Sequence, residues 1–341
     1  MLPGLVVVAA ATAVAVGLGD VIPGLNPATC AVLLGALLAN TGLHTEALRP
    51  GTHLAAHRVL RLAVVLLGFQ LSATTVRAIG PAGALLVAVT VAVTFTGMLV
   101  LGRLFGLSTA RSLLLASGYS ICGASAVAAV RDAVDADEDD VAVAVALVTL
   151  CGSLAIVVLP ALHGVLGLDP VQFGSWVGAS VHDVGQTVAT AQAVPGALAV
   201  AMVIKLSRVA LLLPLVAVLG LRARRINVAS EEQCPGAPTP SDATRVGVGV
   251  GVRTPVLPLF LLGFVTAFAL NSTGWVPAPA LTVLHQTQHI ALVAALVGLG
   301  TGIHRRVLRR AGGPALLVGL GGWVLVAGTA LGMVHLAGIT G

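Results

Sequence analysis

Long apolar runs separated by short polar segments are the dominant pattern along the chain. Runs of about 17 to 24 residues recur, and an α-helix of about 20 apolar residues crosses a hydrocarbon layer of about 30 Å. The pattern predicts an all-α polytopic membrane bundle of about 11 transmembrane helices, at 3–19, 27–41, 59–76, 82–104, 110–131, 141–161, 172–193, 198–220, 255–270, 281–303 and 314–337.

The composition supports a membrane protein. Only 9% of the 341 residues are charged and 57% are hydrophobic, whereas a soluble domain carries about 25% charged residues. The 41 glycines favour close packing between membrane helices. Aromatic residues make up only 3% of the chain, so few rings can stack on bases. We expect the lipid bilayer as a partner and no nucleic acid.

The distribution of basic residues predicts the topology. In the predicted loops, fourteen arginines fall on one side and only Arg77 and Arg131 on the other. Cytoplasmic loops of membrane proteins accumulate Lys and Arg. We therefore expect the N-terminus in the cytoplasm and the C-terminus outside. The acidic run at 135–140 then lies on the outer side, as a solvated helix start.

The chain is expected to form a single transmembrane transporter domain over residues 1–341. A polar stretch rich in Pro and Gly at about 226–254 reads as a cytoplasmic linker between eight spans and three. Residues 66–89 resemble residues 296–320, each with a Gly-Pro pair, and in the span count the two regions run in opposite directions. The resemblance suggests an inverted-topology repeat. Chance recurrence in a glycine-rich chain is the alternative.

Two apolar segments are interrupted by small and polar residues: ASGYSICGASA at 116–126 and GASVHDVGQT at 178–187. A helix that unwinds inside a membrane must have its freed backbone groups met by protein, water or solute. Both segments are predicted to be discontinuous helices whose N-termini face a bound anion. Alternatively, the small residues only pack helices. The candidate substrate-binding residues here are Ser120, Gly123, Ser125, Gly178 and Ser180.

Four ionisable residues complete the predicted site. Asp183 is the only carboxylate well inside an apolar span, and it follows His182. Lys205 and Arg208 lie three residues apart in the next span, hence on one helix face. Because burying charge in a membrane is costly, a functional role is the default interpretation. Lys205 and Arg208 would hold the anion while Asp183, with His182, exchanges a proton. A static ion pair of Asp183 with either cation is the structural alternative.

Other chemistries lack their motifs. The four cysteines show no CxxC or Cys/His spacing, and His285 and His289 lack the glutamate and the third ligand of a zinc site. No phosphate-binding loop, GxSxG elbow or dinucleotide fingerprint is present. We expect no metal, no cofactor and no catalytic residues, and hence no enzyme.

Four stretches carry a family resemblance: LRLAVVLLGFQLS (60–72), ASGYSICGASAVAAV (116–130), FGSWVGASVHDVGQTVATA (173–191) and VIKLSRVALLLPLV (203–216). Over nearly its whole length the chain resembles the YeiH-type family of bacterial inner-membrane proteins, for which sulfate export has been suggested. The resemblance implies a multi-pass protein of the bacterial plasma membrane. Gln70 stands where the family usually has arginine. More distantly, the chain is similar to bile-acid and cation/proton transporters with crossed broken helices.

The expected function is a secondary transporter that exports a small anion such as sulfate or a related sulfur oxyanion, with a coupling proton or sodium ion, as a monomer or a homo-oligomer. A proton or sodium exchanger using Asp183 and Lys205 is one alternative, and a membrane-embedded enzyme using His182 and Asp183 is another. In the eleven-span count the two interrupted segments run parallel, whereas an inverted repeat requires antiparallel segments. Either one segment is a re-entrant hairpin or the repeat is accidental.

Overall fold

A computed structural model describes the chain except residues 22–25, 71–72, 132–133, 135, 213, 216–217, 220–258, 303–312 and 340–341. Its regular structure over the described residues is entirely helical, as predicted. The predicted linker at 226–254 lies outside this part of the chain. The helices are α1 (Leu2–Val21), α2 (Pro27–Asn40), α3 (Arg49–Leu54), η1 (Ala55–Val59), α4 (Leu60–Leu67), η2 (Gly68–Gln70), α5 (Ala73–Leu104), α6 (Thr109–Ser120), α7 (Ala124–Val130), α8 (Glu138–Leu166), α9 (Pro170–Ser180), α10 (Val184–Ala191), α11 (Ala197–Ala210), α13 (Leu259–Ser272), α14 (Ala278–Gly300) and α16 (Gly313–Leu336).

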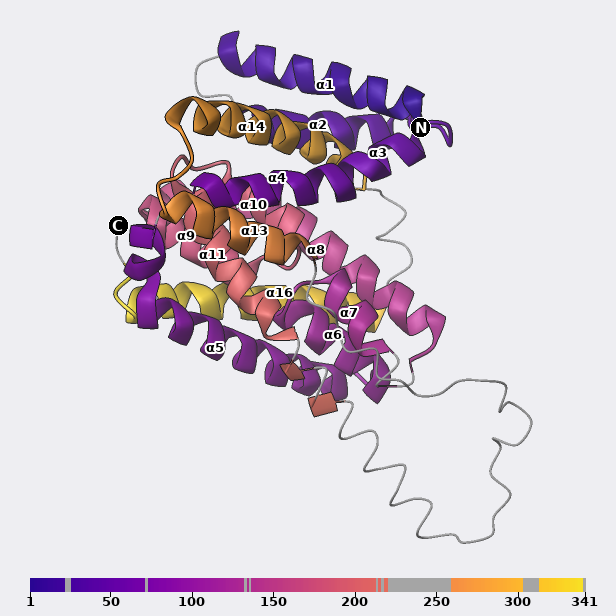
Figure 1. Cartoon of the computed structure of the whole chain (residues 1–341). Coiled ribbons are helices and arrows are strands. Elements are labelled where there is room, and N and C mark those ends of the chain that lie inside the picture. Colours follow the sequence, from indigo (N-terminus) through magenta and orange to yellow (C-terminus); the bar gives the residue numbers. More distant parts are fainter. Residues whose placement is uncertain are drawn as a thin grey trace, which may run out of the picture.

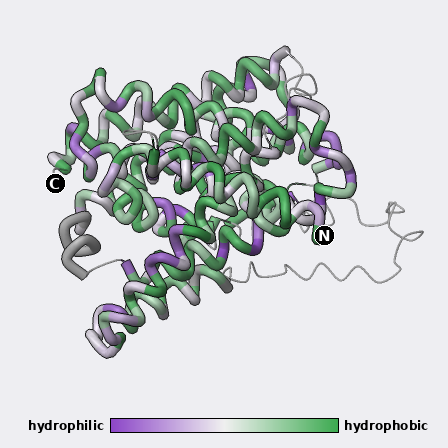
Figure 2. Tube along the Cα trace, turned by 90° about the horizontal axis from the view of Figure 1, so that it is seen from above, coloured by the Kyte–Doolittle hydropathy of each residue, from purple (hydrophilic) through white to green (hydrophobic). Residues whose placement is uncertain are grey.

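Six helical stretches among the described residues are long and apolar enough to cross a membrane. They are Leu2–Gly19, Arg49–Gln70, Gly80–Leu104, Glu138–Leu166, Ala278–Gly300 and Gly313–Leu336. Hydrophobic residues predominate over most of the helical part of the chain (Figure 2). The chain is therefore a helical membrane protein, although several predicted spans correspond to shorter helices.

The helices form two bundles that lie side by side (Figure 1). The first bundle contains α1, α2, the run from α3 to η2, α13 and α14, which pack on one another. The second bundle contains α5 to α11 and α16. Helix α10 of the second bundle packs against α14 and α2 of the first. The contact between the bundles is thus made by one half of an interrupted segment.

Corresponding helices of the two regions that resemble each other run antiparallel. Gln70, at the end of η2, donates a hydrogen bond to Gln288, in the middle of α14, at 2.9 Å. At the other end of this pair of helical segments, a Cβ added to Gly298 of α14 would lie 2.6 Å from the carbonyl oxygen of Thr52 in α3. Helix α5 is likewise antiparallel to α16, because Gly97 meets Leu325 and Leu101 meets Gly321.

Helices α6 and α7 fold back on each other instead of forming one crossing. Arg111, in the first turn of α6, and Arg131, just after α7, both pair with acidic residues in the first turn of α8. A Cβ on Gly118 of α6 would come within 2.9 Å of Val127 in α7. The predicted single span at 110–131 is therefore wrong. The acidic run lies at the same end of the fold as Arg111, not at the opposite end.

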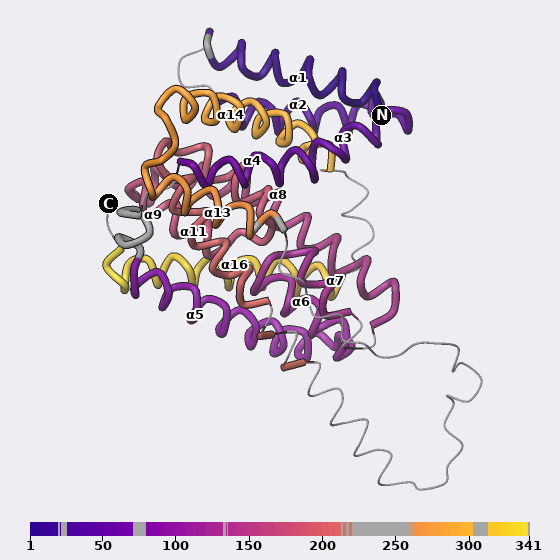
Figure 3. Tube along the Cα trace, in the orientation of Figure 1, coloured from indigo at the N-terminus to yellow at the C-terminus, as the bar shows by residue number. Residues whose placement is uncertain are grey.

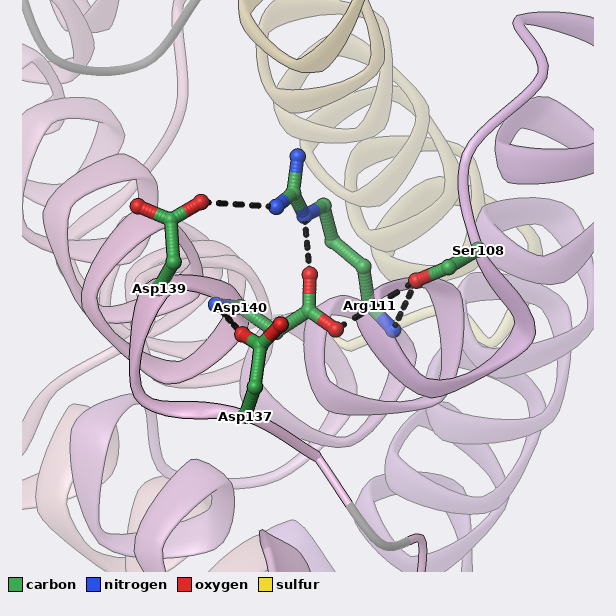
Figure 4. Close-up of polar contacts among 5 residues, drawn as sticks. All are labelled: Ser108, Arg111, Asp137, Asp139 and Asp140. Atoms are coloured by element: carbon green, nitrogen blue, oxygen red, sulfur yellow. Dashed lines mark hydrogen bonds and ion pairs between the residues drawn. The ribbon is translucent and has the colours of Figure 1, made fainter.

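A polar cluster fixes the base of this hairpin (Figure 4). Ser108 caps α6 by accepting the backbone N–H of Arg111 at 3.1 Å, and Asp137 caps α8 by accepting that of Asp140 at 2.6 Å. The Arg111 guanidinium binds Asp140 and, at 2.9 Å, Asp139. The caps satisfy N–H groups that helix starts leave unpaired, and the ion pairs join the two helix starts.

Helices α9 and α10 form a second hairpin. The first hairpin lies next to the start of α8, and the second begins at the end of α8, on the opposite side of the fold. Helix α9 begins four residues after α8 ends, and a Cβ on Gly196, beyond α10, would lie 3.5 Å from Pro170 at the start of α9. Helices α9 and α11 run parallel, with Gly174 against Ala197 and Gly178 against Ala201. The predicted single span at 172–193 is therefore also wrong. Because the two hairpins point in opposite directions, their tips meet.

Candidate functional site

The tip of the first hairpin is a tight turn at residues 121–123. Helix α6 ends at Ser120, whose hydroxyl donates to the carbonyl of Ala116 at 2.6 Å. Gly123 has φ +72°, a conformation that side-chain-bearing residues rarely adopt. A Cβ on Gly123 would lie 2.9 Å from Val148, in the middle of α8, and 3.5 Å from His182. Glycine thus permits both the turn and the contact with the second tip.

At the tip of the second hairpin, Asp183 is the N-cap of α10. Its carboxylate accepts the backbone N–H of Gly185 at 2.8 Å, and Gln186 accepts the N–H of Asp183 at 3.3 Å in a capping box. The Gln186 side chain also donates to the Thr149 carbonyl of α8 at 3.1 Å. These bonds provide partners for the backbone that is freed where α9 and α10 are interrupted.

Lys205 binds the backbone of both tips. Its ammonium group donates to the carbonyl oxygens of Ile121 at 3.0 Å, Val181 at 2.7 Å and His182. An ammonium group has three N–H donors, so all three are used. Its side chain is completely buried.

Arg208, one helical turn further along α11, also binds backbone carbonyls and is completely buried. On α6 it donates to Tyr119 at 2.8 Å and to Ser120 at 2.8 and 3.1 Å. On the second hairpin its acceptors are Gly178 at 3.4 Å, Ala179 at 2.5 Å and Val181 at 3.2 Å. The planar guanidinium therefore bridges the ends of α6 and α9.

The two cations thus neutralise helix C-termini. The last carbonyls of a helix have no partner within the helix and carry partial negative charge. Lys205 and Arg208 satisfy these groups for α6 and α9 together. The ion pairs of the described residues include none between Asp183 and either cation. The sequence predicted an anion or Asp183 as the partner of these cations, whereas their hydrogen bonds go to backbone carbonyls.

The other predicted site residues lie around the same junction. Ser180 is buried and donates its hydroxyl to the Trp176 carbonyl at 2.6 Å. Gly178 packs on the backbone of Ala201, where a Cβ would overlap the carbonyl oxygen. The buried His182 ring lies 4.2 Å from that of Tyr119, measured between centroids. Ser120, Gly178 and Ser180 therefore belong to the packed junction between the tips.

A cavity of about 550 Å³ lies between the two bundles. Of the predicted site residues, Ser125 and Asp183 line it. The opposite wall, from the first bundle, carries basic residues that were not predicted as site residues: His44, Arg49, His53, His57 and Arg61. Of these, only Arg49 and Arg61 entered the sequence-based prediction, as part of the arginine count that gave the topology. The regular four-residue spacing of the basic residues from Arg49 onward was the signal that could have identified them.

A second, smaller cavity lies toward the other end of the same interface. Its volume is about 300 Å³, and its lining includes Gln70, Gln192 and Gln288. Asn26, the N-cap of α2, also donates a hydrogen bond to the Gln192 carbonyl and so links the bundles there. Gly185 of α10 packs against Leu60 and Leu299 of the first bundle, two residues that line the larger cavity.

The fold and site define a polytopic helical membrane protein with a cavity between two bundles. A family model described as "Conserved hypothetical protein 698" matches residues 3–319. A UPF0324 membrane protein of Corynebacterium glutamicum is 36% identical, over 96% of this chain and 90% of its own length. The UPF0324 inner membrane protein YeiH is 31% identical in Escherichia coli K12, over 98% and 94%, and 30% in Salmonella typhimurium, over 97% and 93%.

The chain therefore belongs to this YeiH-like UPF0324 family of conserved bacterial membrane proteins, as the sequence motifs predicted. No solved structure matches it.

Proposed function

We propose that the protein is a secondary transporter that moves a small anion, such as sulfate or a related sulfur oxyanion, across the bacterial plasma membrane. The lining of the larger cavity carries this proposal. Among its described residues are two arginines and three histidines but only one carboxylate, that of Asp183. A cleft lined mainly by one sign of charge concentrates ions of the opposite sign.

The arrangement of the cavities supports alternating access. The two cavities lie toward opposite ends of one interface, and they have no described lining residue in common. A shift of one bundle against the other would close the larger cavity and enlarge the smaller one. Such rigid-body movement around a fixed site is the usual basis of secondary transport.

In this proposal the two hairpins are interrupted segments that meet inside the membrane, and Lys205 and Arg208 hold their tips together. Both tips contact Val148 or Thr149, in the middle of α8. Unwound backbone at membrane depth requires such internal partners. The cations thereby support the cavity wall that contains Asp183, while the basic residues of the first bundle attract the anion.

Orientation follows from the arginine distribution. Because the first hairpin does not cross, Arg131 joins Arg111 at the arginine-rich end, where Arg49 also lies. This end would face the cytoplasm, so the larger cavity would accept its anion from inside the cell. The N-terminus would be cytoplasmic and the C-terminus outside.

The test is uptake of radiolabelled sulfate into proteoliposomes containing the purified protein. We expect saturable uptake that falls by about tenfold or more in Arg61→Gln, because a charge-assisted hydrogen bond contributes about 1.5–3 kcal/mol. Arg58→Gln is the matched control, since Arg58 is exposed on the same helical run but does not line the cavity. No uptake or counterflow of sulfate, sulfite or other small oxyanions would refute the proposal.

A proton or sodium exchanger is the second candidate, because Asp183 faces the cavity and a carboxylate can bind either cation. Its signature is dissipation of a pH gradient that needs no anion and is lost in Asp183→Asn. Catalysis is less well supported, because the Ser180 hydroxyl is buried and donates to a backbone carbonyl.

A further inference from the structure

Four basic residues form a stripe along the wall of the larger cavity. Arg49, His53, His57 and Arg61 are spaced four residues apart, and all four line the cavity. We call them the basic stripe. All four are exposed at the surface of the fold.

A π-helical turn keeps the stripe on one face. In an α-helix, positions four residues apart drift by about 40° per step, because each residue turns the helix by about 100°. Helix η1, at Ala55–Val59, is a π-helix, whose wider i to i+5 turn rotates less per residue. It therefore opposes the drift between α3 and α4. Single π-turns within α-helices are rare and frequently occur at functional sites.

The π-turn stacks the two imidazole rings. The ring centroids of His53 and His57 are 4.0 Å apart with an interplanar angle of 22°, and the His57 ring nitrogen Nδ1 lies 3.0 Å from the His53 carbonyl oxygen. Two protonated rings so close would repel each other. A doubly negative ion beside the stack would offset that repulsion and favour protonation.

The groups that surround the stack are mainly basic or neutral. Arg49 and Arg61 flank it, and Arg49 also pairs at 3.3 Å with the exposed Glu46. His44, which lies 3.0 Å from the Thr52 hydroxyl, lines the same cavity. Across the cavity, α10 contributes the carboxylate of its N-cap Asp183. The described lining residues of α7, α8, α13 and α14 include no titratable group.

We propose that the basic stripe is a proton-linked site for a doubly charged tetrahedral oxyanion. Arg49 and Arg61 donate to the anion, and the His53–His57 pair takes up one proton from water as the anion binds. When the anion leaves, the proton returns to water, so one proton accompanies each dianion. This assignment rests on the proposed transport function and adds its coupling ion.

The experiment is calorimetric titration of the full-length protein with sulfate at pH 6, 7 and 8, in two buffers of different ionisation enthalpy. Free histidine titrates near pH 6.5. Above that pH, a site that takes up one proton loses about tenfold in affinity per pH unit. We therefore expect sulfate to bind about tenfold more weakly at pH 8 than at pH 7, with close to one proton taken up.

The His53→Asn, His57→Asn double variant should take up no proton and bind sulfate with little dependence on pH. His335→Asn is the matched control, because His335 is exposed at the end of α16, outside the cavity. It should behave as the native protein does. Arg61→Gln should weaken binding at every pH while keeping the pH slope.

Sulfate binding with the same pH slope in the double variant would overturn the stripe as a proton-linked site but leave anion transport standing. Binding displaced by soluble short-chain phosphatidylglycerol, and not by other free dianions, would also overturn it, because the stripe would then be a lipid-headgroup contact. Complete absence of oxyanion binding at every pH would refute the proposed function itself.

Discussion

At the scale of single residues, the partners of a charge decide its role. Lys205 and Arg208 use their donors on backbone carbonyls, so they stabilise a junction between helices. Arg61 lies on the cavity wall, where solute can reach it. The sequence pointed to the buried cations because intramembrane charges are usually functional, and it did not identify the stripe. It could not reveal that nearby carbonyls already occupy them.

A prediction at this scale concerns the acidic residues at the start of α8. The Asp140 side chain is 9% exposed and that of its partner Arg111 is 25% exposed, whereas Asp139 is 78% exposed. Breaking a largely buried pair leaves a charge without its partner. Asp140→Asn should therefore lower the free energy of unfolding by about 1–3 kcal/mol.

Asp139→Asn is the control and should cost less than about 1 kcal/mol, as exposed pairs do. Thermal unfolding in detergent measures both variants. Equal losses would show that burial of Asp140 contributes nothing to the hairpin base.

At the scale of elements, the structure depends on which way the chain turns where a helix is interrupted. The sequence singled out the two segments in which α6 gives way to α7 and α9 gives way to α10, because glycine and hydroxyl residues replace large aliphatic ones there. It did not predict the turn direction, since a hairpin of two half-length helices and one full crossing have similar apolar length. The contacts of Arg111 with Asp140 and of Gly196 with Pro170 distinguish them.

Close approach between α9 and α11 gives a prediction at this scale. A Cβ on Gly178 would overlap the carbonyl oxygen of Ala201, which is backbone and cannot rotate away. Gly178→Ala should therefore destabilise the protein by about 1–3 kcal/mol through overpacking. Gly328→Ala, at an exposed position of α16 with nothing within 4 Å, should be neutral or stabilising. Unfolding temperatures of the two variants provide the comparison, and equal values would contradict the packing.

At the scale of the whole molecule, the two hairpins enter from opposite ends of the fold, which resolves the conflict between parallel interruptions and an inverted repeat. The start of α1 and the end of α16 lie at opposite ends of the helices (Figure 3). Compared with the eleven-span count, the two hairpins place only the loops before and after α8 on the other side of the membrane. The arginine asymmetry therefore becomes stronger than the eleven-span count suggested.

Labelling from one side of the membrane tests this topology. In a Cys234→Ser background, with the other three cysteines buried, Phe105→Cys and Ala136→Cys should react with an impermeant maleimide from the same side. Trp275→Cys, before α14, should react only from the other side. If Ala136→Cys labels together with Trp275→Cys, the first hairpin crosses the membrane and the described fold is wrong.

The sequence by itself determined that the chain is a helical membrane protein and to which family it belongs, and it drew attention to two segments interrupted by small and polar residues. These features are local, because the length of an apolar run and the residues that interrupt it can be read from consecutive positions of the chain. The tertiary structure alone decided that both interruptions fold back, that Lys205 and Arg208 bind helix ends, and that a π-turn aligns four basic side chains beside a cavity. Each of these depends on contacts between residues far apart in the chain, and hydropathy along the chain carries no information about such contacts.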